Sequence, residues 1–450
     1  MTVEQALASW VAGLSWEAVP PRVQATVENL LLDAVASALA GRTQDLLQRA
    51  DAPARAFAGP GQATVIGAEP SSPAAATFLN AYAVTSATIC DVYRPGLCHV
   101  TPVTLPPVLA LGEERDVPGV ELLAAFAAGL EVTVRLSQAL NYGQMRSRGW
   151  HSPGVVGPVG AAAAGARLLG LDERRVSAAL AHAAAQGAGT FAALGTEAVK
   201  FNQARAAVSA LLAVLVAEGG LVAAPLWLTD DDGGMAVAYT TDADPEAATR
   251  ELGTTWELER ISLRRWPAAS SVQSLIELCL RLSREQHIDV RNVESVAIEL
   301  GPSAYDVSGD RGWTDSLSAQ QSARWVAAAV LHDGDWWIEQ SSAARIGDPE
   351  VSSFARERVS AVMAPDLGSA GVRVQVALCD GSAVELAADH APGDPEEPLD
   401  RAQIEEKLRH AAPTAGIAGS PDELIEGFRG LAGARSVAPV VGLLRAGASR

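Results

Sequence analysis

The chain has almost no lysine: of its 34 basic residues only Lys200 and Lys407 are lysines, and all the others are arginines. Cysteine is also scarce, with four residues scattered along the sequence (Cys90, Cys98, Cys279 and Cys379). No CxxC pair occurs, and no His/Cys spacing of a zinc or iron–sulfur site. We therefore expect no structural metal and a reducing, cytoplasmic environment.

Aromatic residues make up only 5% of the chain, and its apolar runs are too short or too charged to cross a membrane. The N-terminal segment carries Glu4 and lacks the basic region of a signal peptide. Acidic residues outnumber basic ones by 53 to 34, which gives a formal net charge of −19. A field of that sign repels nucleic acid and anionic membranes, so we expect neither as a partner. A site for an anionic substrate must then gather positive charge locally.

Common motifs of nucleotide and hydrolase sites are missing as well. The sequence contains no Walker A loop, no GxGxxG after a strand, no HExxH and no GxSxG at a strand-to-helix turn. This favours chemistry performed by side-chain acids and bases, without a metal or an organic cofactor.

Helical patterns fill the first half of the chain, in which alanine is abundant. Apolar residues at helical spacing predict helices over 22–41, 119–140, 158–169, 173–186 and 203–218. We expect the first helix to end at Gly41 and the fourth to be capped by Asp172. Small residues in GPVGAAAAGA and ALAHAAAQGAG indicate helices that pack closely against one another.

The pattern changes near residue 255. Segments 293–300 and 371–387 alternate apolar and polar residues, and the second contains the hairpin signal Asp380-Gly381. Helical patterns occur before and between these segments, at 270–284 and 318–331, and return in the tail from residue 400. We predict a mostly α chain with a large all-α helical domain formed by both chain ends, residues 1–262 and 394–450, and a smaller inserted α+β domain, residues 263–393.

Two histidines stand in a context that favours a site. His99 lies in a proline-rich loop before a helix, and loops on a rigid scaffold often carry catalytic residues. His151 precedes a Gly/Ala helix and follows two arginines, and helix N-termini and guanidinium groups both bind carboxylates. A single loop histidine is nevertheless more often a surface or structural residue. We interpret His182 as a core or interface residue, and four others as surface residues (His287, His332, His390 and His410).

Lys200 lies at the start of a long apolar helix and is followed by Arg205. A desolvated lysine can transfer a proton or bind a carboxylate, whereas the alternative is a solvated residue in the first helical turn.

Taken together, several segments resemble the 2-methylcitrate dehydratase (MmgE/PrpD) family, which also contains cis-aconitate decarboxylases and an iminodisuccinate epimerase. The resemblance runs nearly end to end. It rests on the order and spacing of the Asp91…His99 loop with TLPPVLALGE, then AAFAAGLEVTVRL, GWHSPGVVGPVGAAAAGARLLGLDERRVSAALAHAAAQGAG, KFNQARAAVSALLAVLVAEGG, SLRRWP, SAQQSARWVAAAVLHDG and GDPEEPLDRAQIEEKLRHAA.

The resemblance implies a cofactor-independent enzyme and a homodimer, with the active site between a helical domain and a lid domain. It places His99 and His151 on the two active-site histidine positions and Asp91 on an acidic position. The chain also departs from the family pattern. The family lysine before the RAA helix falls on Val199, beside Lys200, and the lid lysine, histidine and tyrosine are replaced by Arg264, Gln273 and Trp325.

We therefore predict a lyase that moves a proton next to a carboxylate of a small polycarboxylic acid. Imidazole suits this transfer, and fixed positive charge stabilises the enediolate that develops. The predicted catalytic residues are His99, His151, Asp91 and Lys200. The predicted substrate-binding residues are Tyr93, Arg94, Thr101, Arg148, Arg264, Gln273 and Trp325.

Dehydration is the first expectation because it is the commonest reaction in the family. Decarboxylation and epimerisation are alternatives on the same fold. A non-catalytic scaffold protein and a metal-dependent hydratase are further alternatives.

Overall fold

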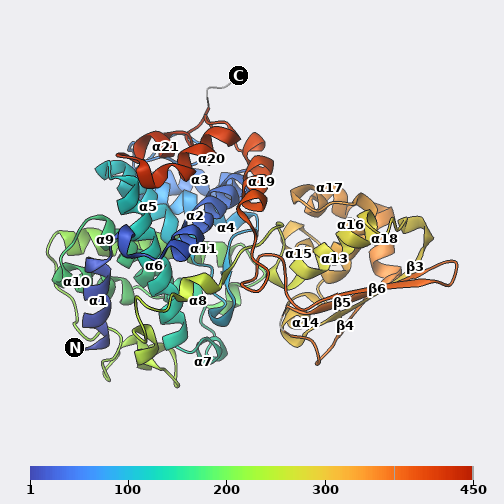
Figure 1. The fold of residues 1–450 in the computed structure, drawn as a ribbon, viewed down its shortest axis with the longest axis horizontal. Helices are drawn as coiled ribbons and strands as arrows, with labels where there is room; N and C mark the ends of the chain where they lie inside the picture. Colours follow the sequence, from blue (N-terminus) through green and yellow to red (C-terminus); the bar gives the residue numbers. More distant parts are fainter. Residues whose placement is uncertain (369, 448–450) are drawn as a thin grey trace. The chain divides into compact units, whose positions relative to one another are not determined.

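The computed structural model describes residues 1–368 and 370–447 (Figure 1). The chain divides into two compact units. The helical unit comprises Met1–Ser86, Cys90–Ile261 and Asp400–Arg450, and the second unit comprises Ala87–Ile89 and Ser262–Leu399. The predicted fold class, a mostly α chain with a small sheet-containing part, is confirmed.

Helices from both chain ends build the helical unit. They are α1 (Val3–Gly13), α2 (Pro21–Arg42), α3 (Asp45–Ala58), α4 (Pro73–Ser86), α5 (Thr101–Arg115), α6 (Gly119–Ala139), α7 (Tyr142–Ser147), α8 (Ser152–Val155), α9 (Gly157–Leu168), α10 (Glu173–Ala184), α11 (Ala198–Glu218), α12 (Met235–Tyr239), α19 (Arg401–Ala411), α20 (Pro421–Arg429) and α21 (Ala438–Gly442). The late helices α19 and α20, red in Figure 1, pack on the early helix α2. As predicted, Asp172 caps α10 by accepting the backbone N–H of Arg175.

The centre of this unit is a tightly packed layer in which α6, α9 and α11 are buried over most of their length. A Cβ atom on Gly129 of α6 would lie 2.7 Å from the Cβ of Ala164, and one on Gly160 of α9 would lie 1.8 Å from the hydroxyl oxygen of Thr133. The small residues therefore let the backbones of α6 and α9 approach closely, as their sequence indicated.

Gly41 does not end its helix, so the expectation of a glycine C-cap is wrong. Helix α2 continues to Arg42, and Thr43 occupies the C-cap position. Gly41 instead faces α4, where an added Cβ would lie 1.8 Å from the carbonyl oxygen of Ala83. The glycine is needed for the approach of two helices and not for a left-handed turn.

We expect Gly41→Ala to lower the free energy of unfolding by about 1–3 kcal/mol, because overpacking outweighs the higher helix propensity of alanine. Urea unfolding followed by circular dichroism measures the change. Gly13→Ala is the control, because a Cβ on Gly13 meets no atom within 4 Å. Equal stabilities of the two variants would contradict this account of Gly41.

Helix α11 is the one helix among the described residues whose length and composition would allow it to cross a membrane. More than half of its most apolar window is buried within the protein, where it packs on α4, α9 and α10. Core helices commonly pass the same test, so the finding is weak evidence for a membrane span.

The second unit contains a four-stranded sheet with the strand order β4-β3-β5-β6. Strand β3 (Val293–Leu300) pairs in parallel with β4 (Val359–Met363) and antiparallel with β5 (Val372–Leu378), which forms a hairpin with β6 (Ala383–Ala388). The hairpin turn has Gly381 at φ +84°, as the Asp-Gly signal predicted. A separate two-stranded sheet joins β1 (Val92–Tyr93) and β2 (Ile261–Ser262).

The second unit also contains helices, several of which pack against the sheet. They are α13 (Gln273–Arg284), α14 (Pro302–Ser308), α15 (Ser316–Ala319), α16 (Ala323–Asp333), α17 (Ala343–Ile346) and α18 (Pro349–Glu357). The single helix expected over 318–331 is in fact two helices, α15 and α16. The break occurs because the side chain of Ser322 caps the N-terminus of α16 by accepting the backbone N–H of Trp325.

A buried ion pair ties the C-terminal segment to the beginning of the chain. Lys407 Nζ of α19 lies 2.6 Å from Asp33 Oδ1 of α2, and these side chains are 2% and 0% exposed. Arg401, one and a half turns earlier on α19, reaches Glu28 of α2 at 3.2 Å, but both of those side chains are partly exposed. Because α19 supplies both contacts, the residues after the second unit complete the packing of α2.

Candidate active site

Asp91 closes the loop that carries His99. Its carboxylate accepts the backbone N–H of Val100 at 2.8 Å and of Thr101 at 3.0 Å, and also the hydroxyl of Thr101. Burial raises the pKa of Asp91 to about 6, with a further contribution from Cys90, while the hydrogen bond from Thr101 opposes the shift. Asp91 and Thr101, both predicted site residues, are thus hydrogen-bonded to each other at the N-terminus of α5.

His99 is oriented by a backbone carbonyl. Its Nδ1 lies 2.6 Å from the carbonyl oxygen of Asp91, and Cys90 Sγ lies 3.9 Å from the same nitrogen. A carbonyl can only accept, so Nδ1 carries the proton and a neutral His99 has its lone pair on Nε2. The partly buried ring is therefore arranged to take up a proton on Nε2.

His151 is an uncharged, buried imidazole at the N-cap position of α8. It is 5% exposed, and among the described residues no group hydrogen-bonds to its Nδ1. Burial, together with the charges of His99, Lys200 and Arg205, lowers the pKa of His151 to about 3. A neutral imidazole with one unsatisfied nitrogen can receive a hydrogen bond from a ligand or donate one to it.

Lys200 is not a solvated first-turn residue, because only 7% of it is exposed. Its Nζ donates to the carbonyl oxygen of Thr85 on α4 at 2.7 Å. Helix α8, which begins directly after His151, packs against α11, which carries Lys200, and the charges of His99 and Lys200 both act on the His151 ring. This part of the helical unit brings together a proton acceptor, a neutral imidazole and a buried ammonium group.

Comparison with known proteins shows the family of this chain. Residues 5–248 match the MmgE/PrpD N-terminal domain, and residues 266–423 match the MmgE/PrpD C-terminal domain. The chain belongs to the MmgE/PrpD family. Its relatives include a cis-aconitate decarboxylase-like protein of Aspergillus oryzae, which is 27% identical over 90% of this chain and 89% of its own length.

Two mammalian relatives are more distant. The cis-aconitate decarboxylase of Homo sapiens is 24% identical over 91% of this chain and 87% of its own length. That of Mus musculus is 23% identical over 91% and 86%, respectively. The family resemblance is thus confirmed, and the relatives support an enzyme of this family.

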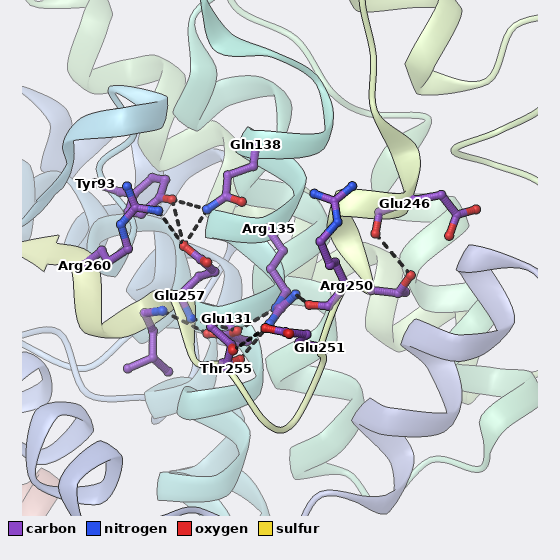
Figure 2. A network of polar contacts seen from close by, with 12 residues as sticks. Tyr93, Glu131, Arg135, Gln138, Glu246, Arg250, Glu251, Thr255, Glu257 and Arg260 are labelled. Atoms are coloured by element: carbon purple, nitrogen blue, oxygen red, sulfur yellow. Dashed lines mark hydrogen bonds and ion pairs between the residues drawn. The ribbon is translucent and has the colours of Figure 1, made fainter.

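Tyr93 anchors the His99 loop of this MmgE/PrpD protein from the other side. Its hydroxyl lies within hydrogen-bond distance of Gln138 and, at 3.4 Å, of Glu257 Oε2 (Figure 2). Gln138 and Arg260 also donate to that oxygen, at 2.6 and 2.9 Å. Burial raises the pKa of Tyr93 to about 12, so the hydroxyl stays protonated. A direct contact between Tyr93 and substrate stays a prediction.

A second buried group supports this network. The carboxylate of Glu131 on α6 accepts the backbone N–H of Glu257 at 3.0 Å and of Leu258 at 2.9 Å, and pairs with Arg135 at 2.6 Å (Figure 2). Arg135 also donates to the carbonyl oxygens of Arg250 and Thr255. Glu257 therefore faces Tyr93 from a segment that α6 holds firmly.

The remaining predicted arginines of the helical unit differ in burial. Arg94 is partly buried and begins the short turn Arg94–Gly96, which the backbone pairing of Tyr93 with Cys98 closes. Arg148 is exposed at the end of α7. That either arginine binds a substrate carboxylate stays a prediction.

The three predicted lid residues lie in the second unit and have structural partners there. Arg264 donates to the carbonyl oxygen of Ala268 at 3.3 Å. The amide of Gln273 donates to the carbonyls of Trp266 and Ala268 and accepts the N–H of Trp266. The buried Trp325 donates its indole N–H to the carbonyl of Gln340. These contacts show how the three side chains are accommodated in the second unit, while their roles in substrate binding stay predictions.

Sequence reasoning missed Thr85, Gln138 and Glu257. Their partners Lys200 and Tyr93 are 45 to 164 residues away in the chain, and no local motif signals such contacts. Within residues 1–368 and 370–447, no group of three or more His, Cys, Asp or Glu side chains is arranged to hold a metal ion.

Proposed function

We propose that this protein is a lyase that acts on a small di- or tricarboxylic acid, with decarboxylation of an unsaturated tricarboxylate such as cis-aconitate as its first candidate reaction. The observation that carries the proposal is the combination of His99, oriented by the Asp91 carbonyl, with the buried neutral His151 and the buried Lys200. The relatives align with about nine-tenths of this chain, and their names support the same reaction class.

In the proposed reaction, the C–C bond to one carboxylate breaks and carbon dioxide leaves. The electron pair is delocalised through the double bond onto a remaining carboxylate. A proton then adds to the carbanion and forms a new C–H bond. His99, protonated on Nε2, supplies that proton, because its Nδ1–H is already committed to Asp91. Lys200 supplies the fixed positive charge near the developing enediolate.

The unequal histidines favour decarboxylation over dehydration. Decarboxylation needs one proton donor, whereas dehydration needs a base for the carbon-bound proton and an acid for the departing hydroxyl group. His151 is a poor candidate for the acid, because its pKa of about 3 leaves it uncharged at neutral pH. We therefore propose that His151 forms a hydrogen bond with the substrate. Dehydration, which was the first expectation from the sequence, becomes the second candidate reaction.

NMR spectroscopy in deuterated water tests the proposal. The purified, EDTA-treated protein would be mixed in turn with cis-aconitate, citrate, 2-methylcitrate, malate and aspartate-derived acids. We expect carbon dioxide release from an unsaturated tricarboxylate, with one deuterium incorporated into the product at the protonated carbon. Alkene formation from a hydroxy acid would indicate dehydration, and deuterium exchange without net conversion would indicate epimerisation.

The variant His99→Asn links the reaction to the site, and His390→Gln, at an exposed position of the second unit, is its control. Conversion that survives in His99→Asn would overturn the assignment of the proton donor. No conversion of any acid by folded protein would contradict the proposed activity and favour a scaffold protein. The homodimer implied by the resemblance stays a prediction, which sedimentation velocity would measure.

A further inference from the structure

Arg205 on α11 is a partly buried arginine that bonds only to neutral groups. Its Nη1 donates to the carbonyl of Gln186 at 3.0 Å and to the hydroxyl of Ser209 at 3.2 Å. Its Nη2 donates to the carbonyls of Gly154 at 3.0 Å and Ala188 at 2.9 Å. In the described part of the chain, its hydrogen-bond partners are thus three carbonyls and one hydroxyl, with no carboxylate among them.

The carbonyls that Arg205 binds belong to the two segments that hold His151. His151 donates its backbone N–H to Gly189 at 3.0 Å, and Ala188 donates to Gly154 at 3.0 Å. The segments are in close contact, because a Cβ on Gly154 would lie 2.2 Å from the carbonyl oxygen of Ala188. Arg205 thus bonds to both sides of the backbone pairing that fixes the position of the imidazole.

The guanidinium group has little capacity left for substrate. An arginine has five N–H donors, and the four hydrogen bonds to Gln186, Ser209, Gly154 and Ala188 occupy both terminal nitrogens. A substrate carboxylate could replace these bonds only by releasing the backbone around His151. The arrangement fits a residue that positions the site better than one that binds the substrate.

We propose that Arg205 is a positioning residue of the lyase site, which fixes the backbone of His151 through three carbonyl groups. The inference rests on the proposed function only for the role of His151 in catalysis. The groups whose charges act on His151 are His99 from its loop and Lys200 and Arg205 from α11, in addition to burial, which has the largest effect.

Two variants test the role of Arg205. Arg205→Met removes the hydrogen bonds and the charge, whereas Arg205→Lys keeps the charge with fewer bonds. The first readout is the pH titration of the His151 ring by NMR with labelled histidine, which needs no substrate. We expect the pKa of His151 to rise in Arg205→Met, because the released backbone exposes the imidazole to water and one positive charge is lost, and to rise less in Arg205→Lys.

The second readout separates kcat from KM on the substrate found in the assay above. We expect kcat to fall about 10²-fold in Arg205→Met, as misplacement of a catalytic group by about 1 Å can cause, with a smaller change in KM. Arg205→Lys should recover part of this loss. Arg42→Met is the matched control: Arg42 is also partly buried, binds the carbonyl of Gly67 at 3.1 Å, and has a pKa lowered by burial.

An unchanged His151 titration in both Arg205 variants would overturn the proposal, as would a rise in KM with kcat preserved, which indicates substrate binding. If Arg205→Met does not fold, Arg205→Lys alone decides between these results. A shifted titration in protein that converts no acid would support the positioning role and contradict the proposed activity, so the two can fail separately.

Discussion

Replacing His99 by asparagine is expected to reduce kcat by about 10²–10⁴-fold, the usual contribution of a positioned proton-transfer group. The asparagine amide can take the place of Nδ1–H and donate to the Asp91 carbonyl, but the variant has no group at the position of Nε2. The loop and the cap on α5 should therefore persist while the proton donor is lost. Steady-state kinetics gives the rate, and circular dichroism with thermal unfolding reports the fold.

The comparison with His390→Gln makes the result specific, since His390 is exposed in the second unit and should leave kcat within a factor of two or so, as surface substitutions usually do. A kcat for His99→Asn within tenfold of the wild type would mean that His99 orients the loop without transferring a proton. A large loss of thermal stability would instead mean that the substitution lowers kcat by destabilising the fold.

Replacing Lys407 by methionine is expected to lower the free energy of unfolding by about 3–5 kcal/mol. The substitution leaves the carboxylate of Asp33 buried in α2 without the ammonium group that lies 2.6 Å from it. An isolated buried charge costs far more than the pair contributes, so removing both charges should restore much of the stability. Urea unfolding of Lys407→Met and of Asp33→Leu/Lys407→Met measures both effects.

Arg401→Met is the matched control, because it breaks another α19–α2 ion pair, with Glu28, whose side chains are partly exposed. Arg401 also lies 3.5 Å from the buried Glu405, but that carboxylate keeps its ion pairs with Arg409 and Arg429 in the variant. Exposed pairs contribute about 0–1 kcal/mol, so this variant should remain close to the wild type. If Lys407→Met were no less stable than Arg401→Met, burial would not be the reason that this lysine occurs in an arginine-rich chain.

The elements that could be predicted from the sequence are those that local chemistry determines. Strand β3 spans the predicted residues 293–300, and the Asp380-Gly381 signal marks the turn between β5 and β6. Asp172 caps α10 as its position before the helical pattern indicated. The family followed from the order of several segments, which is a property of the whole chain.

The features that could not be predicted depend on contacts between distant residues. The role of Gly41 is set by Ala83 on another helix, and Lys200 binds a carbonyl 115 residues away. Strand β4 has only five residues and no clear alternation of burial, so its sequence carries little signal. The unequal charge states expected for the two histidines also follow from burial in the fold and not from their local sequences.

The assembly of the helical unit from both chain ends has a consequence for synthesis on the ribosome. Lys407 follows Asp33 by 374 residues, and α19 and α20 pack on α2. At a rate of synthesis of about 5–20 residues per second, these partners are completed roughly 20–75 s after α2. Until then, the side of α2 that α19 and α20 cover in the finished protein lacks these partners. We expect chaperones to have access to that surface of the nascent chain during this interval.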